Sequence, residues 1–280
     1  MHKIFVRASQ VAFASALAAS LVPANAAQVG YWSFDEASGT TILDSSGSGN
    51  NGVLINGDGA HVSGKLGNAL YFRGVTGSSS TRVSIADSAS LDLSSAASFA
   101  AWIKPDSVYI DAPIFAKEGP LGLAYLFGNY GPSFGVLLDS DGSQPWTYSN
   151  RSQGHIAANK WTFLTATWDG SVVRYFQDGE LVNALAFSGG PLHNSAEALV
   201  IGANGGYNFT AFHGVIDEAR IFNNALTGDE VRALYALAPS VPEPVTSAMM
   251  LAGLGVVGAA LRRRGRSGPD RGCSGWSRWP

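Results

Sequence analysis

Short apolar stretches separated by polar turn residues run through most of the chain. Each stretch has the length of a β-strand, and clusters of Gly, Asp, Asn and Ser separate it from the next. Asp169-Gly170 and Asp178-Gly179 fall after two of these stretches and predict tight hairpin turns. The pattern therefore predicts β-strands over residues 29–34, 69–72, 81–86, 98–103, 133–138, 161–168, 172–176 and 199–201.

One convincing helix follows the strands. Thr227-Gly228-Asp229-Glu230 has the spacing of a capping box, and it precedes an apolar segment over 231–237. Asp229 and Glu230 also suit the positive end of a helix dipole, so we interpret them as structural rather than catalytic. Many strands with no helices between them predict an all-β sandwich or barrel.

The two ends of the chain differ from this domain. Residues 1–26 have a charged start, a short apolar run and Ala24-Asn25-Ala26, the order of a cleaved secretory signal peptide. Residues 245–261 are uncharged and apolar, at the short limit for a transmembrane helix, and an arginine cluster follows over 262–266. Arginines at that edge predict that the helix keeps its C-terminal end in the cytoplasm.

Removing the two ends changes the charge of what remains. The whole chain has a net charge of −3, but 10 basic and 19 acidic residues between 27 and 240 give this domain a net charge near −9. An acidic surface excludes nucleic acid and anionic lipid as partners and is compatible with neutral glycans and divalent cations. The chain's single cysteine, Cys273, excludes a disulfide framework and a cysteine-ligated zinc site.

Several motifs in the domain resemble bacterial laminin-G-like, concanavalin A-like domains. The resemblance covers nearly all of 27–237 in the same order, and it implies a two-sheet antiparallel jelly-roll sandwich with frequent structural calcium and glycan or protein binding. The motifs are Tyr31-Trp32-Ser33-Phe34-Asp35-Glu36, Gly64-Lys65-Leu66-Gly67-Asn68-Ala69, Phe99-Ala100-Ala101-Trp102-Ile103-Lys104-Pro105, Thr167-Trp168-Asp169-Gly170 and Gly214-Val215-Ile216-Asp217-Glu218-Ala219-Arg220.

The C-terminal region resembles the PEP-CTERM sorting signal of Gram-negative bacteria. Its parts are Val241-Pro242-Glu243-Pro244, the helix over 245–261 and the cluster Arg262-Arg263-Arg264 within 262–266. The resemblance implies processing by an exosortase, transient membrane anchoring and delivery to the outer surface or extracellular matrix. Residues 267–280 continue beyond the usual end of such a signal, and a frame extension and a real appendage both stay open.

Asp217 is the strongest candidate metal ligand. Strand alternation places it with Val215, Ala219 and Ile221 on the inner face, where a carboxylate needs a partner. A calcium ion held with Asp35 or Glu36, near the first strand, would satisfy it. The alternative is that backbone N–H groups or an arginine such as Arg220 satisfy Asp217. We interpret Glu218 and Arg220 as an exposed ion pair.

Catalytic patterns are missing from the sequence. There is no Glu-x-Asp-x-Glu pair of the kind that glycoside hydrolases of this fold use, and no Gly-x-Ser-x-Gly or His-x-x-x-His spacing. Aromatic residues beside turn residues predict exposed sugar contacts instead, since aromatic faces stack on sugar rings. These candidates are Tyr130, Trp146, Tyr207 and Asn208, whereas Phe127 and Phe134 are predicted to be core residues.

The sequence therefore predicts an exported, non-catalytic binding module for polysaccharide, with a structural calcium. Two alternatives stay open. One is a structural or adhesion protein of the matrix that acts through protein contacts, and the other is a polysaccharide hydrolase or lyase on the same fold.

Overall fold

The computed structural model describes residues 27–75, 77–108, 111–120, 122–141, 151–187, 190–204 and 210–238. Several predicted features lie outside these residues: the signal peptide, the sorting motif Val241–Pro244 with its helix and arginines, and the sugar contacts Trp146, Tyr207 and Asn208. Within them, no helix is long and apolar enough to cross a membrane.

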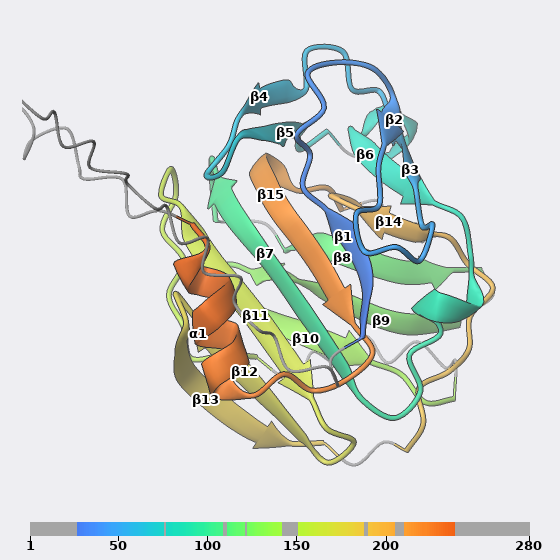
Figure 1. The fold of residues 1–280 in the computed structure, drawn as a ribbon, viewed down its shortest axis with the longest axis vertical. Helices are drawn as coiled ribbons and strands as arrows, with labels where there is room; N and C mark the ends of the chain where they lie inside the picture. The colour runs from blue at the N-terminus through green and yellow to red at the C-terminus, as the bar shows by residue number, and fades with distance from the viewer. Residues whose placement is uncertain are drawn as a thin grey trace, which may run out of the picture. The chain divides into compact units, whose positions relative to one another are not determined.

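Two antiparallel sheets packed face to face make up the described domain (Figure 1). The first sheet has the order β13-β12-β11-β7-β15-β5-β4, and β1 also pairs with β15. Its strands are β1 (Gln28–Trp32), β4 (His61–Ser63), β5 (Asn68–Arg73), β7 (Ala97–Pro105), β11 (Thr162–Trp168), β12 (Val172–Gln177), β13 (Glu180–Ala186) and β15 (His213–Phe222).

The second sheet has the order β10-β9-β8-β14-β6-β3-β2. Its strands are β2 (Thr41–Ile42), β3 (Gly52–Ile55), β6 (Arg82–Ile85), β8 (Ala112–Gly119), β9 (Gly122–Tyr130), β10 (Ser133–Leu138) and β14 (Leu199–Ile201). Two 3-10 turns, η1 (Gly77–Ser79) and η2 (Ala89–Leu91), lie on either side of β6 in the chain. The architecture confirms the predicted jelly-roll sandwich.

The hairpin predicted at Asp169-Gly170 joins β11 to β12. Gly170 takes a φ of +89°, and the Asp169 carboxylate accepts hydrogen bonds from the backbone N–H groups of Ser171 and Val172 at 3.0 and 2.8 Å. Asp178-Gly179 makes the next turn with φ values of +51° and +84°, as an Asp-Gly hairpin turn requires. Both turn predictions are confirmed.

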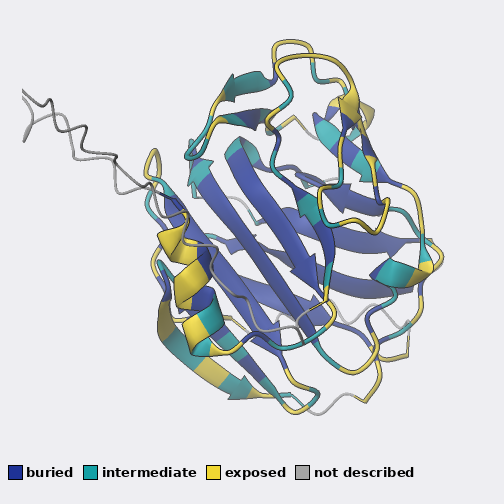
Figure 2. Ribbon diagram, viewed as in Figure 1, coloured by how far each residue is buried: buried dark blue, intermediate teal, exposed yellow. Residues whose placement is uncertain are grey.

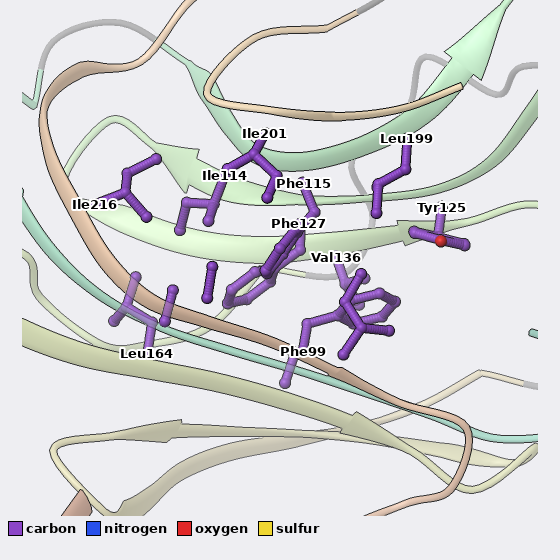
Figure 3. Packing of buried hydrophobic residues seen from close by; sticks show 14 of the residues in the cluster. Phe99, Ile114, Phe115, Tyr125, Phe127, Val136, Leu164, Leu199, Ile201 and Ile216 are labelled. Atoms are coloured by element: carbon purple, nitrogen blue, oxygen red, sulfur yellow. The ribbon is translucent and has the colours of Figure 1, made fainter. Parts of the chain in front are cut away.

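The strands of both sheets are largely buried (Figure 2), and aromatic side chains from both sheets fill the interior (Figure 3). Phe99 of the first sheet packs against Tyr125 and Phe127 of the second, with ring centroids 5.1 and 6.0 Å apart. Phe134 is also fully buried, which confirms Phe127 and Phe134 as core residues. Burial of these large rings supplies much of the hydrophobic stabilisation in a domain without disulfides.

The predicted helix is α1 (Gly228–Ala236), which lies on the outer face of the first sheet (Figure 1). Thr227 and Glu230 exchange side-chain and backbone hydrogen bonds, so the capping box is confirmed. Val231 and Leu234 pack on Trp102 and its apolar neighbours. The outer face of this part of the sheet is therefore a second small core.

Candidate functional site

The strand β15 changes its partner in the middle, at Asp217 and Glu218. Residues 213–216 pair with β5 and residues 219–222 pair with β1, while β7 lies along the other side. A β-bulge lies between the two halves, and Glu218 takes a φ of +53° there. The predicted alternation through β15 was therefore wrong: Ala219 and Ile221 face the core, but the bulge puts Val215 on the opposite face.

Asp217 is fully buried, but on the outer face of the first sheet opposite Trp102 and not on the predicted inner face, and it caps the turn between β4 and β5. Its Oδ2 atom accepts hydrogen bonds from the backbone N–H groups of Lys65 and Leu66 at 2.7 and 2.9 Å. The other oxygen, Oδ1, is buried and has no hydrogen-bond partner within the described residues. Burial raises the pKa of Asp217 to about 7, although the N–H group of Leu66 lowers it.

Asp35 contacts the same turn from its exposed side. Its Oδ1 atom accepts a hydrogen bond from the backbone N–H of Asn68 at 2.9 Å. Glycine is required at Gly67, since a Cβ atom there would lie 2.0 Å from Asp35 Oδ1, and the φ of this residue is +47°. Asp35 and Asp217 thus hold one turn between them. Glu36 points elsewhere, with Oε1 accepting the N–H of Leu43 at 2.8 Å.

This arrangement can be compared with what a calcium ion needs. Calcium takes six to eight oxygen ligands, whereas backbone N–H groups occupy one oxygen of each of these three acids. In the described part of the chain, no three His, Cys, Asp or Glu residues lie close enough to share an ion. The contacts follow the alternative in which N–H groups satisfy Asp217, and calcium at Asp217 Oδ1 stays a prediction.

Glu218 and Arg220 form the predicted ion pair, but it is buried rather than exposed. Their exposed fractions are 5% and 9%. Tyr31 of β1 donates its hydroxyl to the Glu218 carboxylate at 3.0 Å, and the Arg220 guanidinium lies 4.0 Å from the Tyr31 ring centroid. The strand β1 packs on this half of β15 and covers the pair. Alternation along β15 alone could not predict this covering strand.

Tyr130 does not have the exposure predicted for a sugar contact. Its exposed fraction is 4%, and it belongs to an apolar cluster with Leu126 and Leu137. The Arg151 guanidinium lies over its ring at 5.5 Å. Tyr130 is the last residue of β9, so its neighbours in the sheet cover it although a turn follows directly.

A groove of about 560 Å³ lies where the β1–β2 and β3–β4 loops meet. None of its residues was a sequence candidate, although the Asn-Gly-Asp-Gly run marks a turn between strands. The groove is lined by Ala37, Ser38, Gly39, Thr40, Leu54, Asn56, Gly57, Asp58, Gly59 and His61.

Hydrogen bonds hold the groove walls in place, but two polar side chains of the groove make no hydrogen bond within the described residues. His61 Nε2 lies 3.0 Å from the Gly39 carbonyl oxygen, which ties β4 to the opposite wall. Asn56 donates its side-chain amide to the carbonyl oxygens of Ser78 and Ser80 and so holds the floor of the loop. The Ser38 hydroxyl and the Asp58 carboxylate make no hydrogen bond to the described residues and are exposed.

Glycines leave the groove backbone open to a ligand. A Cβ atom added at Gly39 or Gly59 would meet nothing within 4 Å. A hydroxyl-rich molecule could therefore approach the backbone closely, with Asp58 as an acceptor and Ser38 as a donor or acceptor. No Phe, Tyr or Trp is among the lining residues, so recognition here would depend mainly on hydrogen bonds rather than on stacking.

Comparison with protein families gives two matches. The model of the concanavalin A-like lectin/glucanases superfamily matches residues 76–232, more than half of the chain. The model of the PEP-CTERM protein-sorting motif matches residues 240–264, which indicates an exported protein that an exosortase processes at the cell surface. Among curated proteins, none matches the chain.

Similar solved structures include a domain of an arabinanase and the binding domains of two toxins. Domain 4 of a GH43 extracellular arabinanase from Geobacillus stearothermophilus, in complex with arabinotriose, has 22% identity and a TM-score of 0.56, and the match covers 75% of this chain and 98% of that one. The binding domain of Paraclostridial Mosquitocidal Protein 1 has 14% identity and a TM-score of 0.57, covering 74% and 51%. The botulinum neurotoxin serotype G binding domain has 15% identity and a TM-score of 0.57, covering 75% and 51%. At these identities the likeness shows the fold.

Proposed function

The chain belongs to the concanavalin A-like lectin/glucanase superfamily, and we propose that it is an exported, non-catalytic module that binds polysaccharide. The binding takes place at the outer surface or in the extracellular matrix of a Gram-negative bacterium, after an exosortase has removed the sorting helix. The groove between the β1–β2 and β3–β4 loops carries this proposal, because the Asp58 carboxylate, the Ser38 hydroxyl and the open glycine backbone suit sugar hydroxyl groups. The arabinotriose complex of a similar domain supports the same class of ligand.

The charge of the domain narrows the ligand to uncharged polysaccharides. Asp58 is the acid on the groove wall, and Arg73 donates to the Asp58 backbone carbonyl oxygen. No Lys or Arg lines the groove in the described part of the chain, so a uronic acid or sulfate ester would meet the Asp58 carboxylate without an opposing Lys or Arg, which is unfavourable. Neutral glycans can use the same carboxylate as a strong hydrogen-bond acceptor.

The test measures binding of the purified domain, residues 27–240, to an array of neutral and acidic polysaccharides. Asp58→Asn removes the charged acceptor, and we expect it to weaken binding of a neutral glycan about tenfold or more. Asp229→Asn is the matched control, since it removes the same charge from an exposed carboxylate on α1. Trp146, Tyr207 and Asn208 stay predicted contacts and are replaced by alanine in parallel.

The outcomes separate the open alternatives. Equal loss in both aspartate variants, or loss in neither, would exclude the groove as the binding site. A folded domain that binds no polysaccharide would instead favour adhesion through protein contacts. Release of new reducing ends or unsaturated sugars from a bound polysaccharide would favour a hydrolase or a lyase.

A further inference from the structure

Lys117 of β8 places a charged side chain at the edge of the sandwich interior. It follows Phe115 by two residues and therefore shares its inward-facing side of the strand. No part of Lys117 is exposed to solvent. An ammonium group in such a position is very costly unless polar partners surround it.

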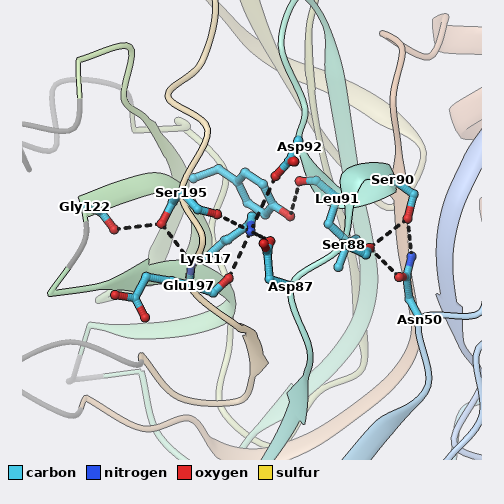
Figure 4. A network of polar contacts seen from close by, with 11 residues as sticks. Asn50, Asp87, Ser88, Ser90, Leu91, Asp92, Lys117, Gly122, Ser195 and Glu197 are labelled. Atoms are coloured by element: carbon cyan, nitrogen blue, oxygen red, sulfur yellow. Dashed lines mark hydrogen bonds and ion pairs between the residues drawn. The ribbon is translucent and has the colours of Figure 1, made fainter.

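Four oxygen atoms from two separate segments, 87–92 and 195–197, surround the Lys117 ammonium (Figure 4). Nζ donates to Asp87 Oδ1 and to the backbone carbonyl oxygen of Ser195, and it donates to the carbonyl oxygen of Glu197 at 2.9 Å. Asp92 Oδ1 lies 3.6 Å away as an ion partner. The three N–H donors of the ammonium thus all have acceptors. We call these four oxygens the Lys117 pocket.

The Lys117 pocket has the chemistry of a site for a hard divalent cation. Two carboxylates and two backbone carbonyls are ligands that calcium prefers, whereas nitrogen and sulfur ligands favour transition metals. The two carboxylates carry one more negative charge than the ammonium balances. Asp92 Oδ1 is also buried and has no hydrogen-bond donor among the described residues, so the Lys117 pocket contains one oxygen that no hydrogen bond satisfies.

We propose that the Lys117 pocket is a cation-binding site whose resident cation is the lysine ammonium, and that Ca²⁺ binds there when the ammonium is removed. The lysine joins the segment 87–92, the strand β8 and the segment 195–197, as a structural metal ion would. Since this cation is covalently attached, it does not dissociate and a chelator cannot remove it. The proposal is independent of the carbohydrate ligand.

Two substitutions of Lys117 test the proposal in the purified domain. Lys117→Ala leaves room for an ion and its water ligands, whereas Lys117→Met fills the same space with an apolar chain of similar length. We expect both variants to be less stable than the parent domain in chelator, since both leave the carboxylates without a cation. Millimolar Ca²⁺ should then raise the Tm of Lys117→Ala by about 5 °C or more above any rise in Lys117→Met.

The comparison between the variants makes the result specific to this pocket. Calcium bound elsewhere, including at Asp217, raises the Tm of both variants equally, so it does not change the difference between their Tm increases. Adding Asp87→Asn and Asp92→Asn to Lys117→Ala should abolish its extra response. If Lys117→Ala is unfolded in chelator, recovery of its near-ultraviolet circular dichroism on adding Ca²⁺ supports the proposal. An equal Ca²⁺ response in the Ala and Met variants, or no recovery of an unfolded Ala variant, would overturn it.

Discussion

Asp217 should make the stability of this domain depend on pH in an unusual direction. Most paired carboxylates stabilise a fold when they are ionised, but Asp217 is buried with its pKa raised from 3.8 to about 7. The folded state therefore binds this proton more tightly than the unfolded state. Its stabilising contribution is complete below pH 3.8 and is lost as the pH rises through about 7.

The magnitude follows from the size of the rise. A pKa that moves from 3.8 to about 7 corresponds by linkage to about 4 kcal/mol of stability lost between these values. Asp217→Asn removes the titration, while its amide oxygen can still accept the N–H groups of Lys65 and Leu66. We expect the difference in unfolding free energy between parent and variant to change by about this amount from pH 4 to pH 8.

Urea unfolding of both proteins from pH 4 to pH 8 in chelator measures this difference. Asp169→Asn is the control: the hydrogen bond from Arg174 lowers the pKa of Asp169, so its titration lies below this pH range and its parent-minus-variant difference should stay nearly constant. A parent-minus-variant difference that stays constant with pH would refute the argument for Asp217. Calcium adds a second comparison at pH 8: an ion bound by ionised Asp217 would stabilise the parent and leave Asp217→Asn unchanged.

Four further substitutions test the fold. Thr227→Ala breaks the capping box of α1 and should cost about 1 kcal/mol in urea unfolding, with Glu230→Gln milder because a glutamine can still accept. Gly67→Ala adds a Cβ atom against Asp35 at a positive φ and should lower the Tm, whereas an unchanged Tm would contradict the close contact. Phe127→Ala leaves a cavity between the sheets and should cost about 3–5 kcal/mol, measured by denaturant unfolding with an unchanged m value.

Local signals in the sequence were enough for much of the fold. Aspartate and glycine at 169–170 and 178–179 specify hairpin turns by backbone conformation alone, and Thr227 with Glu230 specifies a helix start. These features depend on residues close in the chain, so no tertiary contact is needed to predict them. Asp217 is buried as expected, but on the outer face of the first sheet, because the bulge at Glu218 interrupts the alternation of β15.

The remaining errors come from contacts between distant segments. The predicted strands did not include β8 and β9. Every residue of these two strands is buried, so they lack the alternation that marks a half-exposed strand, and Lys117-Glu118-Gly119 at the end of β8 resembles a turn. The bulge at Glu218 exists because β15 changes partner, which no local pattern announces. The Lys117 pocket likewise joins Lys117 to residues 25 to 80 positions away in the chain.

The pairing of β1 with β15 also determines when the domain can fold. Gln28 lies opposite Phe222, so the first strand waits for nearly the last residues of the domain before it has a partner. The strands β5 and β7 depend on β15 in the same way. A chain emerging from a membrane in N-to-C order therefore keeps its first sheet incomplete until residue 222 has emerged, and such non-local pairings form slowly. During that interval the open strand edges are the part of the chain most exposed to aggregation and proteolysis.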